Sequence, residues 1–217
     1  MRLSASDIND LEKRYRAALI NSLSGFKPAN LIGTANAQGQ TNLAVISSVV
    51  HLGSNPPLFG MVQRPPVVPR HTYENILETG VYTVNHIHET IHEQAHQTSA
   101  RFARDESEFD ATGLTPSFVD GFAAPFVTES KIRFGMRLVR DVAIEENGTR
   151  FLIGKVEWID IAEELLAEDG YLNIEKAGSL AISGLDGYHR SEMIGRLSYA
   201  KKDQPLQRLE DPMKGFK

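Results

Sequence analysis

The chain of 217 residues contains no cysteine, which excludes disulfides, thiolate metal ligands and a catalytic thiol. It also lacks a basic tract, and its formal net charge is −5, so we expect no nucleic-acid partner. No apolar run reaches the roughly 18 residues that a membrane-spanning helix needs, and the N-terminus becomes polar too early for a signal peptide. These absences predict a soluble, cytoplasmic protein with no membrane partner.

Long helical patterns are scarce, and short apolar segments separated by turn residues dominate the chain. Residues 6–23 have the spacing of an amphipathic helix that Ser6 can cap. The polar span 88–104 and residues 171–177 favour further helix, whereas 105–128 has no clear periodicity. The sequence predicts strands at residues 31–35, 43–52, 58–62, 81–85, 132–138, 150–161 and 180–184, with a hairpin turn at Asn147-Gly148. Such a pattern favours an antiparallel barrel over a doubly wound parallel sheet.

Nothing in the composition marks a linker between two large domains. We therefore expect one barrel domain over residues 25–200, an N-terminal helix over residues 1–24 that packs on the barrel, and a polar tail over residues 201–217.

The loop before residue 72 has the residue types of an anion site. Arg64 and Arg70 flank a proline-rich segment, and His71 and Thr72 follow. We expect Thr72 to be the N-cap of a helix that ends before Gly80. A helix start carries free N–H groups and a partial positive charge, and Arg meets phosphate oxygens in pairs. The segment therefore predicts a phosphate site, although an ordinary strand-to-helix connection would have the same pattern.

A second motif points to different chemistry. His88, Glu89 and His92 form the pattern H-E-x-x-H, which on a helix would place two zinc ligands on one face beside a general base. However, the motif begins only three residues after a predicted strand, and the surrounding helix is polar on most faces. A zinc hydrolase is therefore the remote alternative, and we assign no metal ligands.

Several segments, taken in order, resemble the flavin reductase-like family of FMN-binding split barrels, which includes flavoredoxin-type proteins. The likeness spans residues 25 to 190. It is carried by Thr41-Asn42-Leu43-Ala44-Val45-Ile46-Ser47-Ser48, by Asn55-Pro56-Pro57-Leu58-Phe59-Gly60-Met61-Val62, and by Arg70-His71-Thr72-Tyr73-Glu74-Asn75-Ile76 followed by Gly80.

The resemblance implies a mainly β fold, a six-stranded antiparallel Greek-key split barrel with peripheral helices, assembled as a homodimer. It also implies FMN as the cofactor, with FAD as the other flavin to consider. The matching positions for flavin contact are Ser47, Ser48, Val49 and Gln63, and those for the phosphate are Arg64, Arg70, His71 and Thr72.

The resemblance further implies an NAD(P)H-dependent flavin reductase or a flavoredoxin-like electron-transfer protein, with NAD(P)H as a transient donor and a small-molecule flavin or other acceptor as partner. The main alternative is a flavin-binding electron carrier without turnover. The hydride chemistry belongs to the flavin, so we name no catalytic residue beyond two weak candidates, Tyr188 and His189, which follow a glycine-rich turn.

Overall fold

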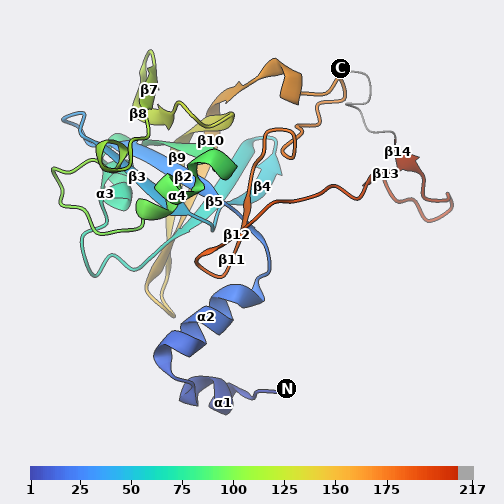
Figure 1. Cartoon of the computed structure of the whole chain (residues 1–217), viewed down its shortest axis with the longest axis horizontal. Helices are drawn as coiled ribbons and strands as arrows, with labels where there is room; N and C mark the ends of the chain where they lie inside the picture. The colour runs from blue at the N-terminus through green and yellow to red at the C-terminus, as the bar shows by residue number, and fades with distance from the viewer. Residues whose placement is uncertain (210–217) are drawn as a thin grey trace.

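The computed structural model describes residues 1–209, and a large antiparallel sheet organises them (Figure 1). The sheet contains seven strands in the order β3-β2-β6-β9-β10-β5-β4. Their bounds are β2 Asn30–Ala35, β3 Thr41–Ile46, β4 Val50–Ser54, β5 Pro57–Gln63, β6 Val81–His86, β9 Ile132–Ile144 and β10 Thr149–Ile161. The prediction of a mainly β, antiparallel fold is confirmed, whereas the strand count in the main sheet is seven rather than six.

Three smaller sheets accompany the main one. The first joins β1 Lys27–Pro28 to β11 Ala181–Ser183 and β12 Gly187–His189. The other two are two-stranded: β7 Pro116–Val119 with β8 Phe122–Val127, and β13 Arg196–Leu197 with β14 Arg208–Leu209. The strand expected at 180–184 is thus present as β11.

The predicted strand over residues 43–52 is wrong as a single element, because the chain leaves the sheet at Ser47 and re-enters it at Val50. At this break the Ser48 hydroxyl donates to the Val62 carbonyl oxygen at 2.9 Å and accepts from the Val62 N–H at 3.1 Å. A side chain therefore takes both main-chain hydrogen bonds of Val62 at this point, and the apolar run alone does not reveal it.

The hairpin between β9 and β10 confirms the turn expected at Asn147-Gly148. Gly148 has a φ of 72°, in the left-handed region that favours glycine. The two strands pair from Ile144 and Thr149 back to Ile132 and Ile161.

The helices differ most from the sequence predictions. The N-terminal segment forms two helices, α1 Ala5–Asp10 and α2 Lys13–Leu23, and Ser4 rather than Ser6 caps the first. Neither helix has a buried residue, and both extend away from the sheet (Figure 1). The span 88–104 contains only a 3₁₀ turn, η1 Glu89–Ile91, and the short helix α4 His92–Gln97.

Two further segments also depart from expectation. The span 105–128 is not irregular, since it contains α5 Glu108–Thr112 as well as β7 and β8. Residues 171–177 form turns instead of a helix, and a 3₁₀ turn, η2 Glu163–Leu165, lies earlier. Part of the predicted polar tail, residues 210–217, lies outside the described residues.

The core is built on both faces of β2, all of whose residues are buried. Leu31 packs in one cluster with Leu43, Ile87 and Phe109, while its neighbour Ile32 packs in another with residues that include Met61, Ile76, Tyr82, Met136 and Leu152. Successive side chains of a strand point to opposite faces, so apolar residues cover the sheet on both sides here. Within residues 1–209, no helix is long and apolar enough to cross a membrane.

The close packing of β10 on β6 gives a first prediction. A Cβ at Gly154 would overlap the Tyr82 hydroxyl and lie 3.0 Å from the Met136 methyl carbon. We expect Gly154→Ala to lower the free energy of unfolding by about 1–3 kcal/mol, because buried groups must shift to admit it. Denaturant unfolding measures the effect, with Gly53→Ala as the control since the nearest atom there is 3.8 Å away. Equal stability of the two variants would contradict the packing described.

Candidate functional site

The helix that follows the proline-rich loop begins without a side-chain cap. This helix, α3 His71–Thr79, has Arg70 as its N-cap residue, and no side-chain hydrogen bond caps it. The prediction of Thr72 as N-cap is therefore wrong, while Gly80, with a φ of 74°, ends the helix as expected. Among residues 1–209, no acceptor meets the N–H groups of His71, Thr72 and Tyr73.

Thr72 is the second residue of the helix rather than its N-cap, and its side chain is directed into the protein. It is 5% exposed, and its hydroxyl oxygen accepts a hydrogen bond from Asn42 of β3 at 2.9 Å. The Asn75 amide, one turn later, donates to the Thr34 hydroxyl of β2 at 3.1 Å. These buried hydrogen bonds fix the first turn of α3 against the sheet.

Arg104 completes this arrangement, and the sequence patterns did not single it out. Its guanidinium donates to Glu74 at 2.8 Å and to the Asn75 side-chain carbonyl at 2.9 Å. The other carboxylate oxygen of Glu74 accepts from the Arg70 N–H at 2.9 Å. A small polar pocket beside α3 is lined by Asn36, Gln40, Thr41, Asn42, His71, Asn75, Arg104 and Glu106. The only signal in the sequence would have been an arginine at the end of the polar span 88–104, three residues after Arg101.

The two arginines predicted from the sequence keep most of their donors free. The Arg70 side chain makes one long hydrogen bond, 3.4 Å from Nε to the Pro65 carbonyl oxygen. Arg64 is exposed, and within residues 1–209 neither arginine forms an ion pair. Two guanidinium groups thus stand at the two ends of the loop that leads to the uncapped helix start.

The second group of predicted residues lies at the break between β3 and β4. Ser47, Ser48 and Val49 are half-buried and outside any strand. Ser48 is hydrogen-bonded to Val62, which precedes Gln63 in β5. The side chain of Gln63 is 7% exposed, and its amide makes no hydrogen bond within the described part of the chain.

The structure connects these two groups through a single loop. Residues 64–70 run from the end of β5, beside Ser48, to the start of α3, beside Asn42. Asn42 and Ser47 lie at opposite ends of the segment that contains β3. Thr72 thus contacts one end of β3, and Ser47, Ser48 and Val49 follow its other end.

The two weak catalytic candidates lie elsewhere, on β12. The Tyr188 hydroxyl is 3.3 Å from His96 Nδ1, and its ring meets those of His92 and His96 edge-on. Burial raises the pKa of Tyr188, and the negative charge of Asp186 raises it further. No hydrogen bond joins Tyr188 to the eight predicted cofactor residues within residues 1–209.

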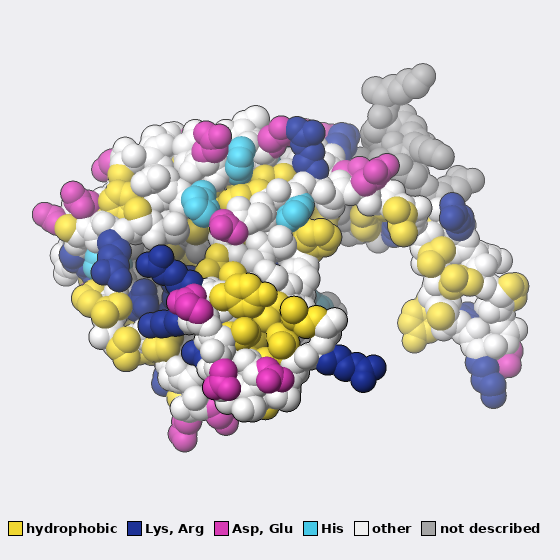
Figure 2. All heavy atoms as spheres, turned by 60° about the horizontal axis from the view of Figure 1, so that its bottom comes forward, with side chains coloured by type: hydrophobic (Ala, Val, Ile, Leu, Met, Phe, Trp, Pro, Cys, Tyr) yellow, Lys and Arg dark blue, Asp and Glu magenta, His cyan; other side chains and the backbone are white. Residues whose placement is uncertain are grey.

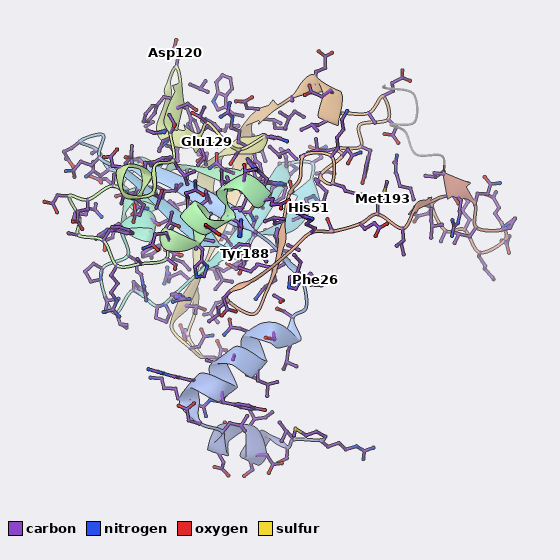
Figure 3. The ribbon with its side chains drawn as sticks, in the orientation of Figure 1. Phe26, His51, Asp120, Glu129, Tyr188 and Met193 are labelled. Atoms are coloured by element: carbon purple, nitrogen blue, oxygen red, sulfur yellow. The ribbon has the colours of Figure 1, made fainter. Side chains whose placement is uncertain are left out.

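The adjacent residue, His189, has its side chain in a different environment. His189 Nε2 is 2.8 Å from the Ser183 hydroxyl, and its ring meets that of Phe26 edge-on at 4.8 Å. Phe26 lies where α2 passes into the body of the protein (Figure 3).

The H-E-x-x-H motif does not form one face of a helix. His88 precedes the 3₁₀ turn η1, and its two ring nitrogens contact the Glu129 carbonyl oxygen at 2.7 Å and the Thr90 hydroxyl at 3.0 Å. Glu89 is paired with Arg190. Within residues 1–209, no group of three metal-ligating side chains comes together. The geometry therefore does not support the zinc alternative.

The large antiparallel sheet, with few and short helices, defines the protein as a mainly β protein of one principal sheet. The chain belongs to the flavin reductase-like family, because the family model described as "Flavin reductase like domain" matches residues 23–192. This confirms the family resemblance stated from the sequence.

Solved structures agree with this assignment. One from Shewanella frigidimarina NCIMB 400, described as a "putative flavin reductase with split barrel domain", is 52% identical, covers 92% of this chain and 100% of that chain, and has a TM-score of 0.89. Nitrilotriacetate monooxygenase component B from Bacillus cereus is 23% identical, with 91% and 98% coverage and a TM-score of 0.80. Flavoredoxin of Desulfovibrio vulgaris (Miyazaki F) is 22% identical, with 82% and 92% coverage and a TM-score of 0.68. The last two likenesses show the fold alone.

The histidine at the end of β6 gives a prediction about pH. Burial lowers the pKa of His86 to about 4, and its Nδ1 lies 2.9 Å from the Ser179 hydroxyl. As the pH falls below the unfolded-state pKa of about 6.5, the unfolded chain takes up a proton that the folded chain does not, so stability falls. We expect His86→Gln to remove about 2 kcal/mol of the stability loss between pH 7.5 and 4.5.

Denaturant unfolding of both proteins at the two pH values measures this difference, and the contributions of all other groups cancel in it. The same pH-dependent loss in both proteins would show that His86 does not titrate in this way.

Proposed function

We propose that this protein binds FMN and acts as an NAD(P)H-dependent oxidoreductase that passes electrons to free flavin or another small acceptor. Membership of the flavin reductase-like family supports oxidoreductase activity and a flavin as the small-molecule partner. The resemblance of the sequence to FMN-binding split barrels favours FMN over FAD. The observation that carries the proposal is the uncapped start of α3, which follows a loop with an arginine at each end.

The start of α3 fits a phosphate group. Three first-turn N–H groups without an acceptor in residues 1–209 are an anion-binding arrangement, and the unpaired guanidinium groups of Arg64 and Arg70 add positive charge. The side chain of His71, the first helical residue, is half-buried. Arg70, His71 and Thr72 would therefore hold the phosphate, Thr72 through its main chain because its hydroxyl already accepts from Asn42.

The break between β3 and β4 fits the polar edge of an isoalloxazine ring. A ring carbonyl or ring nitrogen needs main-chain or amide donors and acceptors, and the segment Ser47–Val49 presents main chain that lies outside any strand. The free amide of Gln63 adds a donor and an acceptor. Ser48, in contrast, uses its hydroxyl on Val62, so its contribution would be to position the main chain.

A bound flavin supplies the hydride and electron chemistry, and the residues named here bind and orient it. The chain has no G-x-G-x-x-G fingerprint, so a nicotinamide donor would bind without a Rossmann half. The homodimer and the cytoplasmic location remain predictions.

An absorption spectrum recorded with and without FMN, followed by anaerobic addition of NADH or NADPH, tests the function. We expect flavin bands at roughly 370 and 450 nm that bleach with the nicotinamide, because the bound flavin accepts hydride. Bands that do not bleach with either donor would instead assign the protein to flavin-binding carriers. A protein that does not bind FMN would contradict the proposal.

The phosphate site is tested by Arg70→Ala. Loss of a charge-assisted hydrogen bond should weaken FMN binding by about 1.5–3 kcal/mol, or roughly 10- to 150-fold in the dissociation constant. Fluorescence titration measures the constant, and Arg101→Ala is the control because it removes the same side chain from an exposed position outside the loop. An unchanged constant for Arg70→Ala would remove Arg70 from the site.

A further inference from the structure

Glu74 places a negative charge beside the start of α3, where the proposed phosphate site lies. One oxygen of its carboxylate accepts a hydrogen bond from the Arg70 N–H at 2.9 Å. A carboxylate near a helix start interacts favourably with the helix dipole, so Glu74 stabilises α3. The same charge repels a phosphate group that binds to the N–H groups of the first turn. A phosphate site at this position therefore requires that the charge of Glu74 be offset.

Arg104 supplies the opposite charge at this point. Its Nη1 donates to the other carboxylate oxygen of Glu74 at 2.8 Å. Its Nη2 donates to the side-chain carbonyl of Asn75 at 2.9 Å. Asn75 is 2% exposed, and its amide donates in turn to the Thr34 hydroxyl of β2. The guanidinium group is thus held between the carboxylate and a buried amide that is fixed to the sheet.

The segment that carries Arg104 is itself held in place. In the turn at residues 103–106, the Ala103 N–H donates to the Glu106 carboxylate at 2.8 Å, and the Glu106 N–H donates to the Ala103 carbonyl oxygen at 3.2 Å. The Ser107 hydroxyl lies 2.7 Å from the Thr41 hydroxyl of β3. Arg104 therefore reaches α3 from a segment that is attached to the main sheet.

Stability alone does not account for this ion pair. The side chains of Arg104 and Glu74 are 41% and 46% exposed, and ion pairs as exposed as this contribute little to the stability of a fold. The pair lies beside the first turn of α3, where the N–H groups of His71, Thr72 and Tyr73 meet no acceptor within residues 1–209. Its position therefore points to a role in binding.

The protein as a whole does not attract an anion. Its formal net charge is −5, and Figure 2 shows Asp and Glu side chains distributed over the face that it draws, together with Lys and Arg side chains. Surface charges are screened beyond about 8 Å at physiological ionic strength. The groups in immediate contact with the start of α3 therefore decide whether a phosphate group is held there.

A buried amide gives independent evidence for a ligand on this side of α3. Gln63 is 7% exposed, and its side chain makes no hydrogen bond within the described part of the chain. Gln63 of β5 pairs with Arg150 of β10, and paired residues project from the same face of a sheet. Arg150 donates to Asp141 at 2.8 Å, and Asp141 accepts from the Tyr73 hydroxyl at 2.7 Å, so the first turn of α3 lies on this face. Buried amides usually have partners, and a bound ligand would supply the one that Gln63 lacks.

From these contacts we propose that Arg104 is a positioning residue that makes the protein selective for a phosphorylated flavin. It does so by holding the Glu74 carboxylate and offsetting its charge beside the phosphate site. Arg104 acts through Glu74 rather than by contact with the ligand. The inference rests on the proposed function, because it requires FMN to bind with its phosphate at α3.

The test compares the dissociation constants of FMN and riboflavin, which have the same ring system and differ in the phosphate. We expect Arg104→Gln to weaken FMN binding by about 10-fold or more and to leave riboflavin binding unchanged, because it exposes the phosphate to an unpaired carboxylate. The loss should shrink as the ionic strength rises. The double variant Glu74→Gln with Arg104→Gln should recover FMN binding to within about threefold of the parent, because the two effects are coupled.

The matched control is Arg137→Gln, which removes the arginine of another exposed ion pair, Arg137 with Glu157 at 2.6 Å. It changes the net charge by the same amount, and Arg137 lies opposite Val81, beyond the other end of α3. We expect this variant to bind FMN as the parent does. Glu74→Gln alone is a further test that does not depend on the folding of Arg104→Gln. It should bind FMN more tightly than the parent, because Arg104 then has no carboxylate to offset.

The outcomes separate this inference from the proposed function. A parent protein that binds no FMN would overturn both. If the parent binds FMN, four results would overturn the inference alone: no loss in Arg104→Gln, an equal loss for FMN and riboflavin, a double variant as weak as Arg104→Gln, or a Glu74→Gln variant that binds FMN no more tightly than the parent.

Discussion

The attachment of α3 to the sheet is the constraint on which the candidate site depends. Thr72 and Asn75 are buried and are hydrogen-bonded to Asn42 and Thr34 on neighbouring strands. Buried polar groups are costly to leave without partners, so these bonds specify the position and rotation of the helix. Thr72 is directed inward and does not cap the helix, and within residues 1–209 the N–H groups of His71, Thr72 and Tyr73 meet no acceptor. One set of hydrogen bonds thus both orders the helix and leaves its start available to a ligand.

The break between β3 and β4 adds a second constraint. The Ser48 hydroxyl makes the two hydrogen bonds to Val62 that the main chain of a neighbouring strand would otherwise make. The segment that leaves the sheet after β3 is thereby held close to β5. The side chains of Thr98 and Glu108 act similarly on β3, where they accept from the N–H groups of Val45 and Leu43 at 2.9 Å each. Side chains therefore satisfy the open edge of β3, and the segment at 47–49 remains free of sheet pairing.

The sequence predicts the strands well because apolar alternation and turn residues are local signals. β2, β5, β6, β9 and β10 all appear close to their expected positions. The break at Ser47 was not predictable, because the acceptor and donor of Ser48 lie 14 residues away on another strand. The wrong prediction for Thr72 has the same cause. Threonine is a favoured N-cap residue, but the hydrogen-bond partner of the Thr72 hydroxyl is Asn42, on another element of the fold. α5, β7 and β8 lack periodicity in the sequence, and long-range packing determines them. Arg104 has no local signal at all.

The candidate site could also be predicted from the sequence only in part. The residue types at Arg64, Arg70 and His71 suggest anion binding through charge and helix geometry alone, whereas the assignment of Ser47, Val49 and Gln63 rests on the family. In the structure, the loop 64–70 connects β5 to α3, and Ser48 and Thr72 have hydrogen-bond partners in Val62 and Asn42. Their part in the proposed flavin site is therefore to place main-chain groups, with the remaining side chains making the direct contacts.

The most direct measurement is a crystal structure of the protein with FMN. We expect the phosphate within hydrogen-bonding distance of the first-turn N–H groups of α3 and of Arg70, with the ring beside Ser47–Val49 and Gln63. FMN found with its phosphate away from α3 would contradict the account, even if the protein proved to be an active flavin reductase.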